Sequence, residues 1–150
     1  YPAYLEAAIH SYAQDNVAAR RWEEVGAMER SRADFAALLP QGLATPGHSL
    51  YEIVANEGGP VIGHLWLAIE RRAGSVSAFV YDLEVRPEHR RQGHAARALQ
   101  ALEPIASSAG ASGIALNVFI NNEAARALYR QLGYVETNVN MRKALASRID

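Results

Sequence analysis

An arginine-rich segment, residues 86–97, carries the clearest chemistry in this sequence. It follows an apolar run and opens an apolar segment with helical periodicity, so it predicts a strand, a turn and a helix start. Four arginines and one acid lie in it. A helix start offers unpaired N–H groups and the positive end of the helix dipole, and Gly93 and Ala95 leave room for phosphate to approach them. Since Arg90 and Arg91 can add charge-assisted hydrogen bonds, we infer an anionic, phosphate-bearing ligand.

Length and composition restrict the classes of protein. The 150 residues are most simply one domain, residues 1–150, of a globular protein. With a net charge of −1 and no aromatic platform beside the local arginines, nucleic-acid binding is the least favoured function. No cysteine is present, which excludes disulfides and thiolate sites, and the five histidines lack ligand spacing, so no metal is expected. No apolar run approaches membrane-spanning length, so we expect no membrane partner.

The elements that position the arginine-rich turn follow from periodicity and turn residues. The first forty residues look helical and lead into a loop at 40–47. The expected strands are 49–55, 60–70, 75–85 and 113–119, the first pair forming a hairpin. Helices are expected at 95–109, bent or ended early by Pro104, and from Asn121 or Asn122 to Gly133. Residues 134–143 should add one bent strand or two short ones. This order predicts a mixed α+β domain in which helices pack on one sheet.

A second motif lies about thirty residues after the first. Residues 122–134 read Asn-Glu-Ala-Ala-Arg-Ala-Leu-Tyr-Arg-Gln-Leu-Gly-Tyr, with Asn122, Ala125 and Tyr129 at set spacings. Together with the Arg90-x-x-Gly93-x-Ala95 pattern, this segment resembles the GCN5-related N-acetyltransferase (GNAT) family. The loop 39–46 is also similar to one in a bacterial subgroup of uncharacterised acetyltransferases.

The resemblance implies a fold and a co-substrate. The expected fold is α/β, a mostly antiparallel central sheet flanked by helices and splayed between the family's fourth and fifth strands. The expected co-substrate is acetyl-CoA, and no metal is required. Two departures stand out, because residues 1–4 show no clear opening strand and because Arg91 stands where the family often has a small residue.

The chemistry of acetyl transfer indicates what else the site needs. An amine must be neutral to attack a thioester, the oxyanion must meet donors, and the leaving thiolate must be protonated. The resemblance assigns that last role to Tyr129 as general acid. Asp82 and Glu84 are the candidate bases, directly or through a water, because they share one face of a strand at period two. Some relatives carry a glutamate near the fifth strand, but residues 116–118 contain none.

The implied cofactor-binding residues come from the strand, the turn and the second motif. Main-chain groups near Glu84 would meet the thioester carbonyl and the pantetheine amides if the strand splays. The full set is Leu83, Val85, Arg90, Arg91, Gln92, Gly93, His94, Ala95, Ala96, Asn122, Ala125 and Tyr129.

Plainer interpretations stand beside these. Tyr129 is also compatible with a core tyrosine packed on Ala125 and Leu132, Asn122 with a helix cap, and Asp82 and Glu84 with surface carboxylates. For the whole chain we expect a cytoplasmic, acetyl-CoA-dependent N-acetyltransferase that acts on a primary amine in a ternary complex, with homodimerisation left open. The alternatives are a non-catalytic acyl-CoA-binding module on the same fold and an adenine-nucleotide binder.

Overall fold

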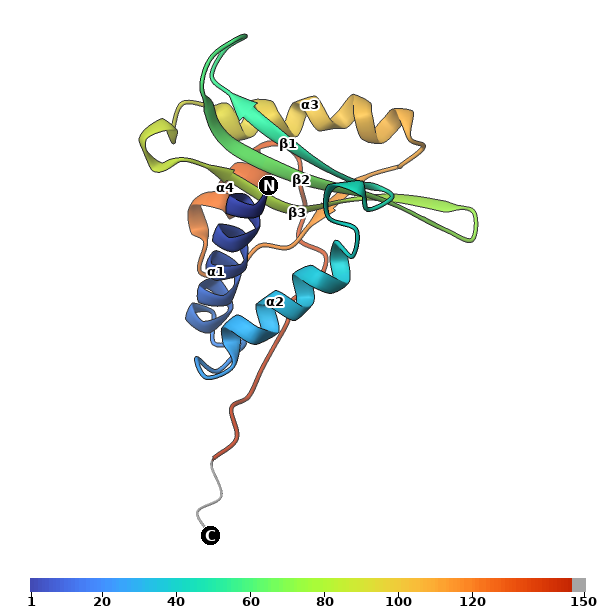
Figure 1. Cartoon of the computed structure of the whole chain (residues 1–150). Helices are drawn as coiled ribbons and strands as arrows, with labels where there is room; N and C mark the ends of the chain where they lie inside the picture. Colours follow the sequence, from blue (N-terminus) through green and yellow to red (C-terminus); the bar gives the residue numbers. More distant parts are fainter. Residues whose placement is uncertain (147–150) are drawn as a thin grey trace.

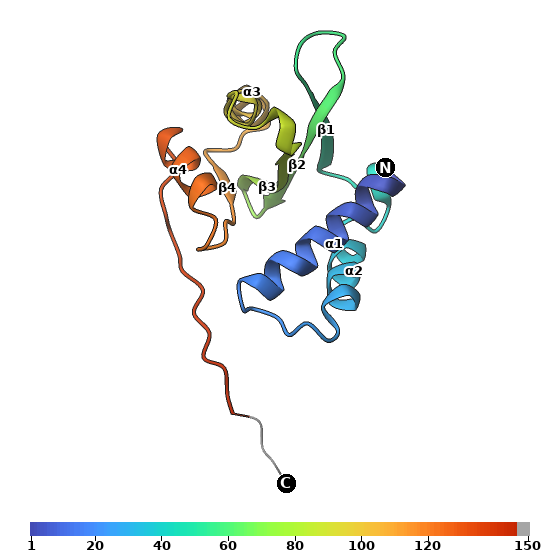
Figure 2. The same ribbon diagram turned by 90° about the vertical axis from the view of Figure 1, so that its left-hand side faces the viewer.

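A computed structural model describes residues 1–146, which form a four-stranded sheet with helices on both faces (Figures 1 and 2). The strands follow the order β1-β2-β3-β4, and only β3 and β4 run parallel. The strands are β1 (His48–Val54), β2 (Val61–Arg72), β3 (Ser75–Val85) and β4 (Ile114–Leu116). The helices are α1 (Pro2–Ala18), α2 (Ala27–Leu38), α3 (His94–Ser108) and α4 (Glu123–Gln131), with short 3₁₀ turns at Gly42–Ala44 and Pro87–His89. The expected mixed sheet flanked by helices is confirmed.

Helices α1 and α2 cover one face of the sheet (Figure 2). Their core includes Ile9 and Phe35, packed against Trp66 of β2, whose side chain is 1% exposed. The indole of Trp66 stacks on Tyr81 of β3 at 4.8 Å between ring centres. Burying aromatic groups of this size dominates the packing on this face and fixes the first helices against the middle of the sheet.

Helices α3 and α4 cover the opposite face (Figure 2). Leu99 and Leu102 of α3 are buried against Leu67 and Val80. Tyr129 of α4 packs at the margin of the same cluster. The two faces therefore hold separate apolar cores, and the sheet divides α3 and α4 from the N-terminal helices.

A β-bulge in β3 changes which side chains face which core. Leu67 of β2 pairs with Val80, whereas the preceding residue, Trp66, pairs with Asp82. Tyr81 is therefore an extra residue in β3. Before the bulge, Val80 faces α3; after it, Leu83 does. The bulge therefore turns Asp82 toward α1, where Tyr4 contacts it. Bulges commonly re-aim side chains near sites in this way.

Strand β3 is paired on both sides for only part of its length. Its parallel ladder with β4 joins Ala78–Val80 to Ile114–Leu116 and goes no further. Residues 82–85 continue to pair with β2 but have no β4 partner. The separation of β3 from β4, which we call the splay, therefore begins after Val80.

Several sequence expectations need correction. Helix α3 continues through Pro104 to Ser108, close to the expected 95–109, so of the two expected effects of the proline, a bend or an early end, the early end is wrong. The flanking Leu102 and Ala106 are buried and hold that turn in place. Strand β4 is three residues long instead of seven. Residues 134–143 form no strand and are largely exposed, so the predicted closing strand is wrong. No helix among residues 1–146 is long and apolar enough to cross a membrane.

Candidate active site

The turn between β3 and α3 leads into a helix start whose main-chain N–H groups can bind an anion. Gly93, at φ 81°, is the N-cap of α3, and no side chain caps the first turn. Arg91 also has a positive φ, 61°, which is rare outside glycine and marks local strain. The first N–H groups of a helix have no intrahelical partner, so those at the start of α3 are left for a ligand or water. Gln92 and Gly93 are exposed, whereas His94, Ala95 and Ala96 are partly buried.

The arginines of this turn do not all point outward. Arg90 folds back, and its Nε donates to the carbonyl of Val85 at 2.8 Å, so it braces the turn against β3. Arg97, absent from the sequence-based set, lies across the helix start. Its Nη2 donates to the Gln92 carbonyl at 3.0 Å and lies 2.9 Å from His94 Nδ1. A Cβ at Gly93 would stand 2.8 Å from Arg97 Nη1, so this guanidinium covers the first turn.

The remaining predicted cofactor residues come from two elements, β3 and α4. Leu83 is partly buried and Val85 is buried, both on the α3 side of β3. On α4, Oδ1 of Asn122 accepts a hydrogen bond from the Ala125 N–H at 3.2 Å, so Asn122 caps this helix. The helix ends at Gln131, followed by Gly133 with φ 93°, the left-handed residue expected there.

Tyr129 projects from α4 toward the buried cluster beneath α3. Its ring lies 5.8 Å from that of Tyr134. Burial raises the pKa of its hydroxyl, with smaller contributions from Tyr134 and from the charge of Asp82. The Asp82 carboxylate therefore acts electrostatically on Tyr129, although the two residues come from opposite sides of the sheet.

The most elaborate polar cluster surrounds Asp82. The Tyr4 hydroxyl donates to Asp82 Oδ2 at 2.9 Å, and His64 Nε2 lies 3.1 Å from the same oxygen. His64 Nε2 is also 3.6 Å from Glu84 Oε2, and its ring packs edge-on against Tyr4 at 4.5 Å. Asp82 and Glu84 thus lie on one face of β3, with His64 of β2 between them. Burial, then the charge of Asp82, raises the pKa of Tyr4, so its hydroxyl stays a donor.

A third carboxylate lies within electrostatic range of this cluster. Partial desolvation raises the pKa of Asp15 near the end of α1, and the charges of Asp82 and Glu84 raise it further. The three acids create a negative potential where α1 meets the end of β3. Such a potential attracts cationic ligands. Within residues 1–146, no group of three or more acids and histidines is arranged to hold a metal ion.

A glycine on β2 brings the two strands of the site close together. Gly63 pairs with Val85, and a Cβ at Gly63 would stand 2.2 Å from the carbonyl oxygen of Glu84. Only glycine allows this approach. The close contact fixes the end of β3, which contains Glu84 and leads into the turn before α3.

Comparison with known proteins gives the class to which this fold and site belong. Residues 8–134 match the model of the acetyltransferase (GNAT) family. Since the match covers most of the chain, the protein belongs to this family, whose activity is acetyl transfer.

Named relatives agree with this assignment. The chain is 38% identical over 145 residues to the uncharacterized N-acetyltransferase YycN of Bacillus subtilis (strain 168), covering 97% of this chain and 92% of YycN. It is 33% identical over 145 residues to the uncharacterized N-acetyltransferase YdgE of the same organism, with the same coverage. A crystal structure of YycN matches with a TM-score of 0.89 at 37% identity, covering 98% of this chain and 93% of that one.

Sequence reasoning missed four residues that the geometry brings to the site: Tyr4, Asp15, His64 and Arg97. Arg97 carried a signal, because it lies one helical turn after Gly93 in the arginine-rich segment. His64 could be paired with Glu84 only by a register that includes the bulge at Tyr81. Tyr4 and Asp15 reach the site through the packing of α1, which no local pattern reveals.

Proposed function

We propose that this protein transfers an acetyl group from acetyl-CoA to a primary amine in a ternary complex. One observation carries the proposal: β3 loses its β4 partner after Val80, and the freed stretch separates an uncapped helix start on one face from a carboxylate cluster on the other. We also propose that residues 1–150 act as a single acyl-CoA N-acyltransferase domain.

In this proposal the cofactor's diphosphate lies on the main-chain amides of residues 92–96. The absent side-chain cap, the left-handed Gly93 and the guanidinium of Arg97 all suit a doubly charged group there. Arg91 adds positive charge at the exposed side of the turn, while Arg90 holds the turn against Val85. Asn122 and Ala125 contact the cofactor from the start of α4.

The unpaired stretch of β3 holds the pantetheine arm and the thioester. Main-chain groups of residues 83–85 on the side facing away from β2 offer donors and acceptors, as a neighbouring strand would. A donor there also meets the oxyanion that develops when the amine attacks, which is an effective way to lower the barrier. Leu83 and Val85 supply the apolar wall on the α3 side.

Proton transfers complete the reaction. The amine nitrogen attacks the thioester carbonyl, a C–N bond forms, and the C–S bond breaks. The amine proton passes to the group formed by Asp82, Glu84 and His64, directly or through a water. If His64 Nε2 donates to Asp82, its Nδ1 keeps a lone pair that can accept this proton. Tyr129 gives its hydroxyl proton to the leaving thiolate.

The carboxylates also attract the amine to the site before the reaction begins. An alkylamine arrives mainly as a cation, and the negative potential of Asp15, Asp82 and Glu84 draws it to the site. The same acids then lie close enough to take its proton. The acceptor class we propose is therefore a primary alkylamine.

A thiol-release assay with acetyl-CoA and a panel of primary amines tests this function. We expect amine-dependent release of coenzyme A, with the acetylated amine detected by mass spectrometry in equal amount. Binding of coenzyme A is measured in parallel by calorimetry. Tight binding without turnover on any amine would instead identify a non-catalytic acyl-CoA-binding module. Equal binding of ATP and coenzyme A would favour an adenine-nucleotide binder.

A further inference from the structure

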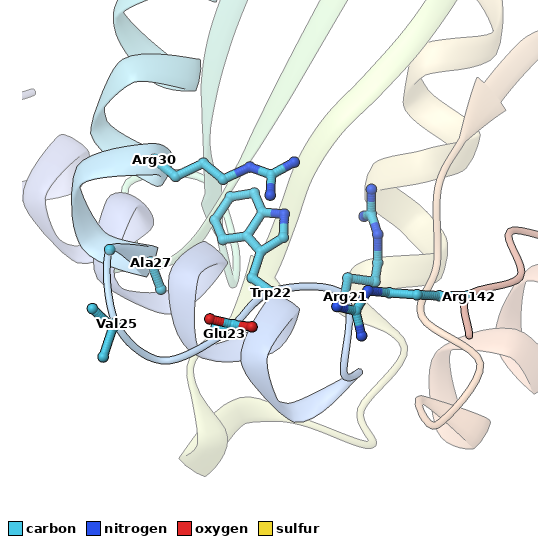
Figure 3. A pocket seen from close by; sticks show the side chains of 8 residues that line it. Arg21, Trp22, Glu23, Val25, Ala27, Arg30 and Arg142 are labelled. Carbon is cyan, nitrogen blue, oxygen red and sulfur yellow. The ribbon is translucent and has the colours of Figure 1, made fainter. Parts of the chain in front are cut away.

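A pocket away from the phosphate-binding turn gathers arginines around a tryptophan (Figure 3). It has a volume of about 360 Å³ and lies at the loop between α1 and α2, closed on one side by the chain after α4. We call it the arginine pocket. Its lining residues are Arg21, Trp22, Glu23, Val25, Gly26, Ala27, Arg30 and Arg142.

The three arginines of this pocket lack carboxylate partners. Within residues 1–146, Arg21, Arg30 and Arg142 form no ion pair, and Glu23 at the same pocket pairs with none of them. Arg142 makes one hydrogen bond, from Nη1 to the Arg20 carbonyl at 3.3 Å. Three cations of like charge beside one concavity repel one another unless an anion joins them.

Trp22 gives separate evidence that the pocket binds a ligand with a hydrogen-bond acceptor. Its side chain is buried, with 7% of the residue exposed, and its indole N–H has no hydrogen-bond partner. A buried donor without an acceptor destabilises the fold, so a ligand oxygen that accepts from it gains affinity. The Arg30 guanidinium lies over the indole at 4.5 Å. Figure 3 shows the indole nitrogen directed toward the side on which Arg21 and Arg142 lie.

The pocket lies on the same side of the sheet as α1, beyond the end of that helix. The guanidinium of Arg21 lies 5.8 Å from the ring centre of Phe119, which follows β4 at the open end of the splay. Asp15, six residues before Arg21, lies within electrostatic range of Asp82. The last turn of α1, which holds Asp15, therefore connects the acids proposed to receive the amine with the pocket residues along the chain.

We propose that the arginine pocket binds an oxyanion, a carboxylate or a phosphate, through Arg21, Arg30 and the Trp22 N–H, with Arg142 joining from the C-terminal segment. Guanidinium groups match the paired oxygens of both anions. The Trp22 nitrogen has no exposed surface, so the oxyanion reaches it only when a neighbouring side chain shifts. Binding should therefore alter Trp22 fluorescence.

The test titrates the protein, saturated with coenzyme A to fill the site at α3, with inorganic phosphate and with acetate at constant ionic strength. Fluorescence and calorimetry follow binding. We expect a saturable change, at least tenfold weaker binding in Arg21→Gln and Arg30→Gln, and no fluorescence change in Trp22→Phe. Arg71→Gln, an exposed arginine of the β2–β3 hairpin, is the matched control and should bind as the parent does. No saturable binding, or equal affinity in all variants, would overturn the proposal.

A second arm identifies the source of the oxyanion and rests on the proposed function. It compares KM for ω-amino carboxylates of increasing length with KM for unsubstituted alkylamines of the same lengths. A lower KM for the carboxylates, abolished by Arg30→Gln, means that the acceptor itself carries the oxyanion. Equal KM values alongside phosphate binding mean that a free anion occupies the pocket. If no amine is acetylated, the proposed function fails while the binding arm still decides the pocket.

Discussion

The hydroxyl of Tyr4 and the carboxylate of Asp82 are joined by a 2.9 Å hydrogen bond across 78 residues of sequence. The bond ties the first turn of α1 to the part of β3 that has left β4. His64 contacts the same carboxylate oxygen from β2. Three elements therefore converge on one acid, which makes Asp82 the centre of the proposed acceptor site.

The first prediction concerns Asp82. Asp82→Asn keeps the size of the side chain and an oxygen for Tyr4, but it removes the charge that orients His64 and attracts the amine. We expect kcat/KM for the amine to fall about 10²-fold or more, the usual range for a lost general base. A steady-state assay of thiol release measures this kcat/KM. Glu57→Gln, in the exposed β1–β2 turn, is the control. Parent-level turnover in Asp82→Asn would exclude Asp82 from proton transfer.

The second prediction concerns Tyr129. Within the described residues its hydroxyl forms no hydrogen bond, so Tyr129→Phe keeps the packing against the buried cluster. Loss of the proton donor should lower kcat by about 10²-fold while the affinity for coenzyme A stays within about twofold. Kinetics and calorimetry on the same preparation separate the two quantities. Unchanged kcat would show that Tyr129 serves only the core.

The third prediction is the pH dependence that follows from Tyr129. Burial raises the pKa of this hydroxyl above its usual value near 10. The protonated form is the donor, so it is fully present below the raised pKa and is lost only above it. We therefore expect kcat to show no decline due to Tyr129 between about pH 7 and pH 9. An alkaline limb below pH 9 that disappears in Tyr129→Phe would contradict the assignment.

The fourth prediction concerns the contact between Gly63 and Glu84. Gly63→Ala places a Cβ against a backbone carbonyl that cannot move without opening the β2–β3 ladder. We expect a loss of roughly 2 kcal/mol in the free energy of unfolding, as for overpacking. In a chain of this size that lowers Tm by about 4–8 °C. Gly113→Ala, where a Cβ meets nothing within 4 Å, is the control. Equal thermal stability of the two variants would argue against this close approach.

The fifth prediction concerns Pro104 in α3. The proline leaves the carbonyl one turn earlier without its helical partner, and its ring crowds that turn. Because Pro104 is exposed, Pro104→Ala loses little packing. We expect a gain of about 1–2 kcal/mol after the added freedom of the unfolded chain is subtracted. Differential scanning calorimetry should then show a higher Tm, and an unchanged or lower value would mean that the helix already absorbs the proline without cost.

Local patterns predicted much of the sheet. The strand at 75–85, the helix starting near residue 94, the cap at Asn122 and the left-handed Gly133 all follow from periodicity and turn chemistry. The extent of α3 agrees with the expected 95–109, and the early end at Pro104 did not occur, because tertiary burial of Leu102 and Ala106 outweighs the cost of one proline. The strand expected at residues 134–143 did not form. These residues include β-favouring types, but they pair with no strand and are largely exposed, so tertiary packing does not support one there.

The carboxylate cluster shows a second limit of sequence reasoning. Counting back from the two-residue turn at Ala73 and Gly74 pairs His64 with Leu83, but the extra residue Tyr81 moves that partner to Glu84. Alternation within β3 puts Asp82 and Glu84 on one face, yet only the bulge decides that this face meets α1. Long-range packing then brings in Tyr4.

A crystal structure with coenzyme A bound is the sharpest test of the proposed site. We expect diphosphate oxygens about 3 Å from main-chain nitrogens of residues 92–96, a typical hydrogen-bond distance. We also expect the pantetheine arm beside residues 83–85 and the sulfur within reach of the Tyr129 hydroxyl. A diphosphate bound elsewhere, or a sulfur directed away from both Tyr129 and Asp82, would contradict the proposal.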